Sequence, residues 1–224
     1  IAGLGAAVVT ASIAVGAFAM SSVDVGKKFD TAMSQVAATM GVTIDEVSEL
    51  RQFAMDMGAK TAFSATQAAN ALNYMALAGY SAKDSMEALP NVLNLAAAGG
   101  IELAAASDMV TDAQSALGLS MKESALLVDK IAKTSSKSNT SVAQLGNAIL
   151  AIGGTAKNLA GGTTELNAAL GILADNSMKG SEGGTHLRNI IMSLAAPTGN
   201  AANAIKSLGL DVFDAQGKMR PLSE

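Results

Sequence analysis

The side chains that could do chemistry are scattered singly along this sequence, apart from one small acidic cluster. Asp45, Glu46 and Glu49 are the carboxylates nearest to one another. Grouped carboxylates can hold a cation, but these follow a helix-start signal, where negative charge stabilises the positive end of the helix dipole. We interpret the cluster as structural, and the sequence predicts no metal site.

The single histidine, His186, is the candidate general base. The hydroxyls of Ser181, Thr185 and Ser193 lie near it in sequence, but such a nucleophile also needs a group that orients the base, and no residue is identified for that role. The absence of cysteine excludes disulfides and thiol chemistry. The glycine-rich stretches GGTAKNLAGG and KGSEGG lack the Gly-Lys-Ser/Thr ending of a phosphate loop. We therefore expect no catalytic residue and no cofactor.

A row of lysines is the sharpest charged feature of the sequence. It consists of Lys122, Lys130, Lys133 and Lys137. At about 100° per residue these positions share one quadrant of a helix. Such a face can contact DNA phosphates or an acidic protein wall; alternatively, because Glu123 and Asp129 dilute it, it is a solvated helix face. The net charge of −4 provides no general case for nucleic-acid binding, so any DNA contact would be local.

The elements that carry these residues are predicted to be helices. Hydrophobic residues make up 50% of the 224 positions, aromatic residues only 3%, and there are three prolines. Alanine and methionine are strong helix formers, whereas β-branched and aromatic residues favour strands. The composition predicts an all-α fold, a compact bundle of roughly ten short helices.

Capping signals predict where several of these helices begin. Four pairs fit the capping box: Thr43 with Glu46, Ser64 with Gln67, Ser120 with Glu123, and Ser141 with Gln144. The glycines expected to set helix exits are Gly79, Gly99, Gly100, Gly183 and Gly184. Pro90 is expected either to kink a helix or to occupy the first turn of a new one.

Two segments of the sequence resemble each other. They begin at Ser64 and Ser141, and in each a capped helix is followed by a second apolar helix. One interpretation is a pair of related helical hairpins packed about a pseudo-twofold axis. The other is coincidence in an alanine-rich composition.

The C-terminal residues change character after Leu210. In DVFDAQGKMRPL, a turn from Asp214 to Gly217 is flanked by Val212, Phe213 and Met219. This pattern predicts a small C-terminal β-hairpin, the only β structure expected. We therefore divide the chain into an apolar helix at 1–23, a helical core domain at 24–210, and a hairpin that starts the next segment at 211–224.

The first 23 residues carry no charge and are about long enough to span a bilayer as a helix. The apolar positions of this candidate membrane segment are Ile1, Leu4, Val8, Val9, Ile13, Val15, Phe18 and Met20. Its small residues fit equally a helix buried against other protein. It is not a signal peptide, because a basic start and an initiator Met are lacking. The start at Ile1 is expected for a segment excised from a longer chain.

From KKFDTAMSQVAATMG onward, the sequence resembles the conserved core of phage tail tape measure proteins. The resemblance continues through FSATQAANALNYMALAGYSAKDSMEALPNVLNLAAAGG, SSKSNTSVAQLGNAILAIGGTAKN and LNAALGILADNSMKGSEGGTHLRNIIMSLAAPT to LGLDVFDAQGKMRP. The segment GSxAGTxLR of that family is matched by residues 180–188, with Gly183 in place of the usual alanine. The resemblance also implies that Arg188 forms a hydrogen-bonded tie at the following helix.

This resemblance implies a structural protein of the virion tail, in the lumen or at the tip. Such a protein acts in tail assembly and length determination, leaves the tube ahead of the DNA, and helps DNA across the host cell envelope. The implied partners are the tail tube protein, tail tip or baseplate hub proteins, tail assembly chaperones, the host membrane and further copies of the chain, with a trimer as the expected homo-oligomer.

The helix pattern restricts this role. A molecular ruler needs extended helices, which rise about 1.5 Å per residue, whereas this segment is cut into short ones. We therefore expect a compact module beside the measuring rod. Two alternative functions are a membrane-inserting pore-forming module and an enzyme. The charges after Asp24 disfavour the pore-forming module. Some family members carry cell-wall-cleaving domains, but this segment has no convergent acid or nucleophile.

Overall fold

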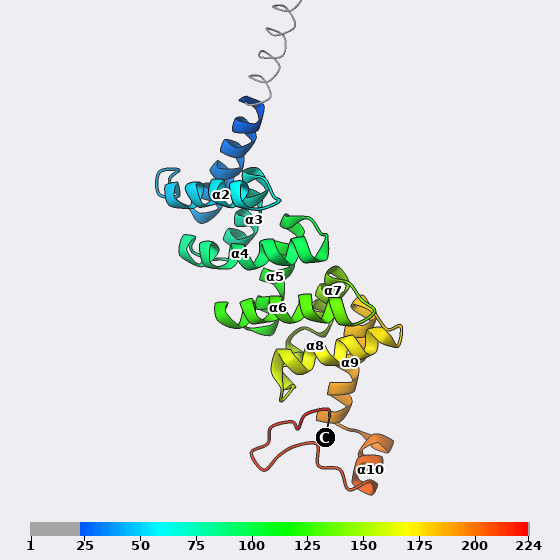
Figure 1. The fold of residues 1–224 in the computed structure, drawn as a ribbon. Coiled ribbons are helices and arrows are strands. Elements are labelled where there is room, and N and C mark those ends of the chain that lie inside the picture. Colours follow the sequence, from blue (N-terminus) through cyan, green and yellow to red (C-terminus); the bar gives the residue numbers. More distant parts are fainter. Residues whose placement is uncertain (1–22, 224) are drawn as a thin grey trace, which may run out of the picture. The chain divides into compact units, whose positions relative to one another are not determined.

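The computed structural model describes residues 23–223, and these residues form a series of short helices (Figure 1). A first helix covers residues 23–40. It is followed by α2 (Ser48–Lys60), α3 (Ala65–Leu77), α4 (Ala82–Gly99), α5 (Leu103–Leu117), α6 (Met121–Lys137), α7 (Val142–Ile152), the 3₁₀ helix η1 (Gly153–Asn158), α8 (Gly162–Asp175), α9 (Gly180–Ala195) and α10 (Gly199–Ser207). The helical class agrees with the composition, since strong helix formers dominate the sequence.

Contacts divide the chain into two units, with the boundary between Met86 and Glu87. In the first unit α2 packs on α3, and the largest buried side chains include Met33, Leu50 and Leu72. In the second unit α7 packs along α9, and α6 lies against α8. The boundary falls inside the predicted core domain 24–210, and that domain division stays a prediction.

Three of the four predicted capping boxes start helices. The Ser64, Ser120 and Ser141 hydroxyls each accept a hydrogen bond from the backbone amide three residues later, and the side chain at that position accepts one in return. These reciprocal bonds satisfy amides that a helix start leaves without partners. A fifth signal that the sequence analysis missed is Ser81 before α4, where Asp84 replaces the usual Glu or Gln.

Thr43 differs from the other three capping residues. Its backbone amide and its hydroxyl both donate to Glu46 Oε2, at 2.8 and 2.7 Å. The α-helix nevertheless begins only at Ser48. Between them the chain makes tight i→i+3 bonds, from the Glu46 amide to the Thr43 carbonyl and from the Ser48 amide to the Asp45 carbonyl, which form turns rather than an α-helix.

The predicted C-terminal β-hairpin is wrong. Within the described part of 211–224 there is one isolated antiparallel bridge, between Phe213 and Met219, and no strand. The turn itself forms. In it the Lys218 amide donates to the Asp214 side chain, at Oδ1 and 2.8 Å, so the turn closes around this carboxylate. Pro221 has no N–H with which to extend the ladder. Of the two bridge partners, Met219 is buried but Phe213 is 41% exposed, so the first arm contributes little to the packed face that a stable hairpin needs.

Pro90 lies inside α4, which runs from Ala82 to Gly99. Of the two alternatives for this proline, the first turn of a new helix is therefore not observed. Because proline has no N–H, it cannot donate to the Met86 carbonyl one turn earlier. The pseudo-twofold relation between the segments that begin at Ser64 and Ser141 remains a prediction.

Candidate contact surfaces

The glycine-rich start of α9 packs against α7 in the second unit. Gly184 is buried, and a Cβ built on it would lie only 2.1 Å from the Ala148 carbonyl oxygen. A Cβ on Gly183 would lie 2.6 Å from the Met178 carbonyl oxygen. Both glycines lie inside α9, not at a helix exit as expected. Gly184 lets α9 approach α7, whereas Gly183 makes room for the Met178 carbonyl in the turn before α9.

The other structural glycines divide between exits and contacts. Gly79 and Gly100 follow α3 and α4 with φ of +84° and +59°, the left-handed conformation that ends a helix. Gly99 is instead the last residue of α4, and a Cβ there would lie 2.8 Å from Val142 Cβ. It lets α4 pack against the start of α7.

The structure brings three of the four predicted lysines to one groove. The groove runs between α6 and α8 and has a volume of about 410 Å³. Lys130, Lys133 and Lys137 line it from α6, while Ala168, Gly171 and Ile172 line it from α8. We call this feature the lysine groove. Lys122 lies elsewhere on α6, at a separate hollow beside Val110 and Val128.

The lysine groove is positively charged on its α6 side. Lys130 Nζ donates to Thr163 Oγ1 at 2.7 Å. Lys133 and Lys137 are exposed and form no ion pair with another described residue. The one carboxylate lining the groove, Asp175, already accepts the Asn139 amide at 2.6 Å.

The candidate chemical groups are held in local contacts. His186 pairs with Glu182 one turn earlier on α9, at 3.7 Å, and both side chains are largely exposed. The Thr185 hydroxyl donates to the Ser181 carbonyl at 2.7 Å, so it is not directed toward His186. Among residues 23–223 no group of His, Asp and Glu side chains is arranged to hold a metal ion.

Arg188 does not form the expected tie. Its side chain is exposed on α9, and within the described residues it makes no hydrogen bond or ion pair. Elsewhere on α9, Ile190 and Met192 are 42% and 55% exposed.

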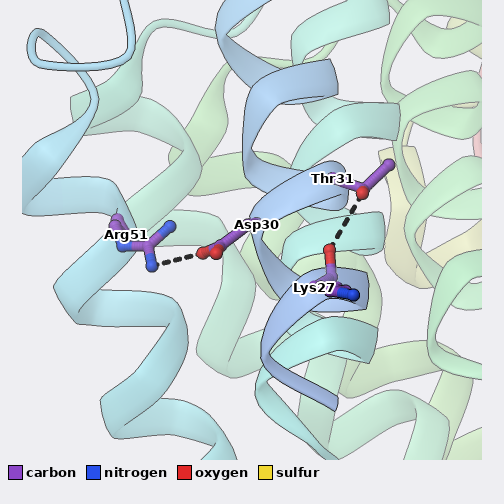
Figure 2. A network of polar contacts seen from close by, with 4 residues as sticks. All are labelled: Lys27, Asp30, Thr31 and Arg51. Atoms are coloured by element: carbon purple, nitrogen blue, oxygen red, sulfur yellow. Dashed lines mark hydrogen bonds and ion pairs between the residues drawn. The ribbon is translucent and has the colours of Figure 1, made fainter. Parts of the chain in front are cut away.

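An arginine contact that the sequence analysis missed joins α2 to the first helix (Figure 2). Arg51 Nη2 lies 2.5 Å from Asp30 Oδ1, and its guanidinium carbon lies 4.8 Å from the centre of the Phe29 ring. In the same view the Thr31 hydroxyl donates to the Lys27 carbonyl at 2.8 Å, within the first helix. No spacing signal marks this tie, because Asp30 and Arg51 are 21 positions apart.

The candidate membrane segment, from Ile1 to Met20, lies outside the described residues. Within residues 23–223, no single helix is both long and apolar enough to cross a bilayer; the bent pair α4 and α5 meets the length and composition criteria only when the two are taken together.

Comparison with known proteins places the sequence among tail proteins of phages. A family model described as phage-related minor tail protein matches residues 51–224. The tape measure protein of Pneumococcus phage Dp-1 is 35% identical over 223 residues, 99% of this chain and 19% of that protein. A probable tape measure protein of Escherichia phage P2 is 32% identical over 199 residues, 88% of this chain and 24% of that protein. The chain thus spans under two thirds of the length of either relative, and no solved structure matches it.

Proposed function

Because the chain belongs to the phage-related minor tail protein family, we propose that it is a folded module of a tape measure protein that acts in tail assembly, length determination and DNA ejection. The tape measure family is structural and its place is the virion tail. We propose further that this module has no enzymatic activity and works through protein contacts. The relatives do not favour the alternative of a membrane-inserting pore module.

The shortness of the helices and their packing against one another support a folded module rather than a measuring rod. The helix α4 has 18 residues, which corresponds to about 27 Å at 1.5 Å per residue. The helices of each unit pack against one another instead of extending the chain. A residue added to such a fold changes a surface loop and leaves the length of the protein unchanged.

Tail length in virions tests this proposal. An insertion of about 30 helix-forming residues in the exposed turn after Thr61 should leave tail length unchanged by electron microscopy. If the segment were part of the rod, the same insertion would lengthen tails by about 45 Å. A second insertion, in the exposed turn at Asp214–Gly217, repeats the test in the other unit. Lengthening by both insertions would contradict the proposal.

Exposed apolar side chains near the C-terminus support assembly through protein contacts. They are Ile190, Met192, Leu208, Leu210 and Phe213, all at least 41% exposed. The helix α10 has no buried residue. Covering exposed apolar side chains stabilises a contact between proteins. We propose the tail tube protein, tail tip or baseplate hub proteins, tail assembly chaperones and further copies of the chain, a trimer, as the proteins that cover such surfaces.

Contact with the host envelope is a separate proposal, and its support is the uncharged stretch of the first 23 residues. Flotation with lipid vesicles tests it, with the purified chain compared with and without residues 1–20. Flotation of only the longer form is expected if this stretch enters a membrane during ejection. If neither form floats, the stretch is buried against protein and envelope contact is contradicted.

A further inference from the structure

The lysine groove is a positively charged surface without a partner in this chain. The ammonium groups of Lys133 and Lys137 are unpaired among the described residues. The wall from α8 combines Ala168, Gly171 and Ile172 with the polar residues Thr164, Asn167 and Asp175, and Ile172 is 64% exposed. Small residues let a helix approach closely. The groove therefore suits a helix that is acidic on one face and has small side chains beside the acids.

The exposed face of α5 has this character. Asp108 and Asp112 are exposed and four positions apart, and Ala105 and Ser115 lie on the same face. Neither aspartate forms an ion pair or side-chain hydrogen bond within the described residues. Partial burial and the charge of Asp112 raise the pKa of Asp108. An opposite charge beside this pair would relieve the repulsion.

We propose that a second copy of this chain docks the acidic face of its α5 into the lysine groove between α6 and α8. The two faces match in charge and in spacing, because Lys133 and Lys137, like Asp108 and Asp112, are four residues apart, a rise of about 6 Å along the helix. Two near-parallel or antiparallel helices thereby place each carboxylate beside an ammonium group. This inference rests on the homo-oligomer of the proposed function and names the surface through which it forms.

The contact is head-to-tail, because each copy offers a different surface to each of its two neighbours. Contacts of this kind close into rings when the rotation between copies allows it. They also leave both surfaces available on a monomer, so single-site variants can complement each other. This complementation distinguishes a second copy from other occupants of the groove.

The test is a charge swap in the full 224-residue chain, followed by sedimentation velocity. Wild type should associate with rising concentration in about 0.1 M salt and dissociate in about 1 M salt, where the Debye length falls from about 10 Å to about 3 Å. Both K133E/K137E and D108K/D112K should weaken association at least about tenfold, because like charges then face each other. The matched control K206E/K218E makes the same charge change on exposed lysines outside the groove and should associate as wild type does.

Mixing the two variants decides the matter. The acidic α5 of K133E/K137E should dock on the intact groove of D108K/D112K, and association should recover to near the wild-type level. Circular dichroism establishes that each variant is folded before mixing. A monomeric wild type, wild-type association by either variant, or no recovery on mixing would each overturn the proposal. A further outcome would also overturn it: wild type binds a short DNA duplex, and K133E/K137E loses this binding but still self-associates. The occupant of the lysine groove would then be nucleic acid. Self-association and DNA binding are measured on the purified chain and do not depend on tail length in virions. This inference and the proposed function can therefore fail separately.

Discussion

At the scale of single residues, contacts distant in sequence determine what each side chain does. Gly184 is important because its missing side chain leaves room for the Ala148 carbonyl oxygen of α7. Arg51 is important because α2 places it against both the carboxylate of Asp30 and the ring of Phe29. Neither role depends on the residue's immediate neighbours in the chain.

Replacement of Gly184 by alanine should destabilise the second unit. The added Cβ would lie 2.1 Å from the Ala148 carbonyl oxygen, so the two helices must separate, and overpacking of this kind costs about 1–3 kcal/mol. Urea denaturation measures the loss. The control is Gly154→Ala in η1, where the nearest atom to the new Cβ is 3.8 Å away, and it should be close to neutral. Equal effects of the two substitutions would contradict the crossing as described.

Replacement of Arg51 by alanine should destabilise the first unit by about 1 kcal/mol, the sum of an exposed ion pair and an exposed cation–π contact. Arg51→Lys keeps the charge and should have a smaller effect. The comparison variant is Lys60→Ala, whose ammonium lies 3.9 Å from Asp56 with both side chains largely exposed. Thermal denaturation that ranks Lys60→Ala as the more damaging change would argue against the Arg51 contact.

At the scale of elements, a serine side chain caps the start of some helices, whereas α2, α5, α8, α9 and α10 begin without a side-chain cap. Ser64, Ser120 and Ser141 make the complete reciprocal pair of bonds. Thr43 donates to Glu46, but within the described residues no backbone amide donates to the Thr43 hydroxyl. A capping sequence therefore starts a helix here only where both bonds form.

Alanine substitution should have different effects at Ser141, which makes both capping-box bonds, and at Thr43, which does not. Ser141→Ala should reduce the free energy of unfolding by about 1 kcal/mol, the usual contribution of an N-cap side chain. Thr43→Ala should have the smaller effect, because the Thr43 backbone amide still donates to Glu46. Chemical denaturation of both variants gives the comparison, and a larger loss for Thr43→Ala would show that its hydroxyl caps a helix after all.

The start of α6 should weaken in acid. Hydrogen bonds from the Ser120 side chain and backbone lower the pKa of Glu123 below its ordinary value. The charged form is therefore favoured in the folded state: the stabilisation is complete above the unfolded-state pKa of about 4.3, and it is lost as pH falls through the lower folded-state pKa. Denaturation midpoints between neutral pH and pH about 3 should converge for wild type and Glu123→Gln. A gap between them that is independent of pH would contradict this linkage.

At the scale of the whole molecule, the described residues form two units with separate sets of contacts, divided between Met86 and Glu87. Each unit buries its own apolar side chains, such as Leu72 in the first and Ile149 in the second. Cooperative opening follows contiguous sets of contacts. We therefore expect the two units to respond separately to a local defect.

Hydrogen exchange measured by mass spectrometry tests this expectation with the Gly184→Ala variant. Protection should fall in α7 and α9, which pack on each other, because the defect lies at their crossing. Protection of α2 and α3 should stay at the wild-type level. An equal loss in all four helices would mean that the chain opens as one cooperative unit.

The local sequence alone determined the helical class, three helix starts and the family. A capping box lies within four consecutive residues, so Ser64, Ser120 and Ser141 could be identified without knowledge of their surroundings. Tertiary structure decided the rest. It placed Gly184 at a helix crossing, joined Arg51 to Asp30, brought Lys130, Lys133 and Lys137 to one groove with α8, and left the C-terminal turn without strands. These outcomes depend on which segments pack together, and packing partners far apart in the chain leave no signal in the spacing of neighbouring residues.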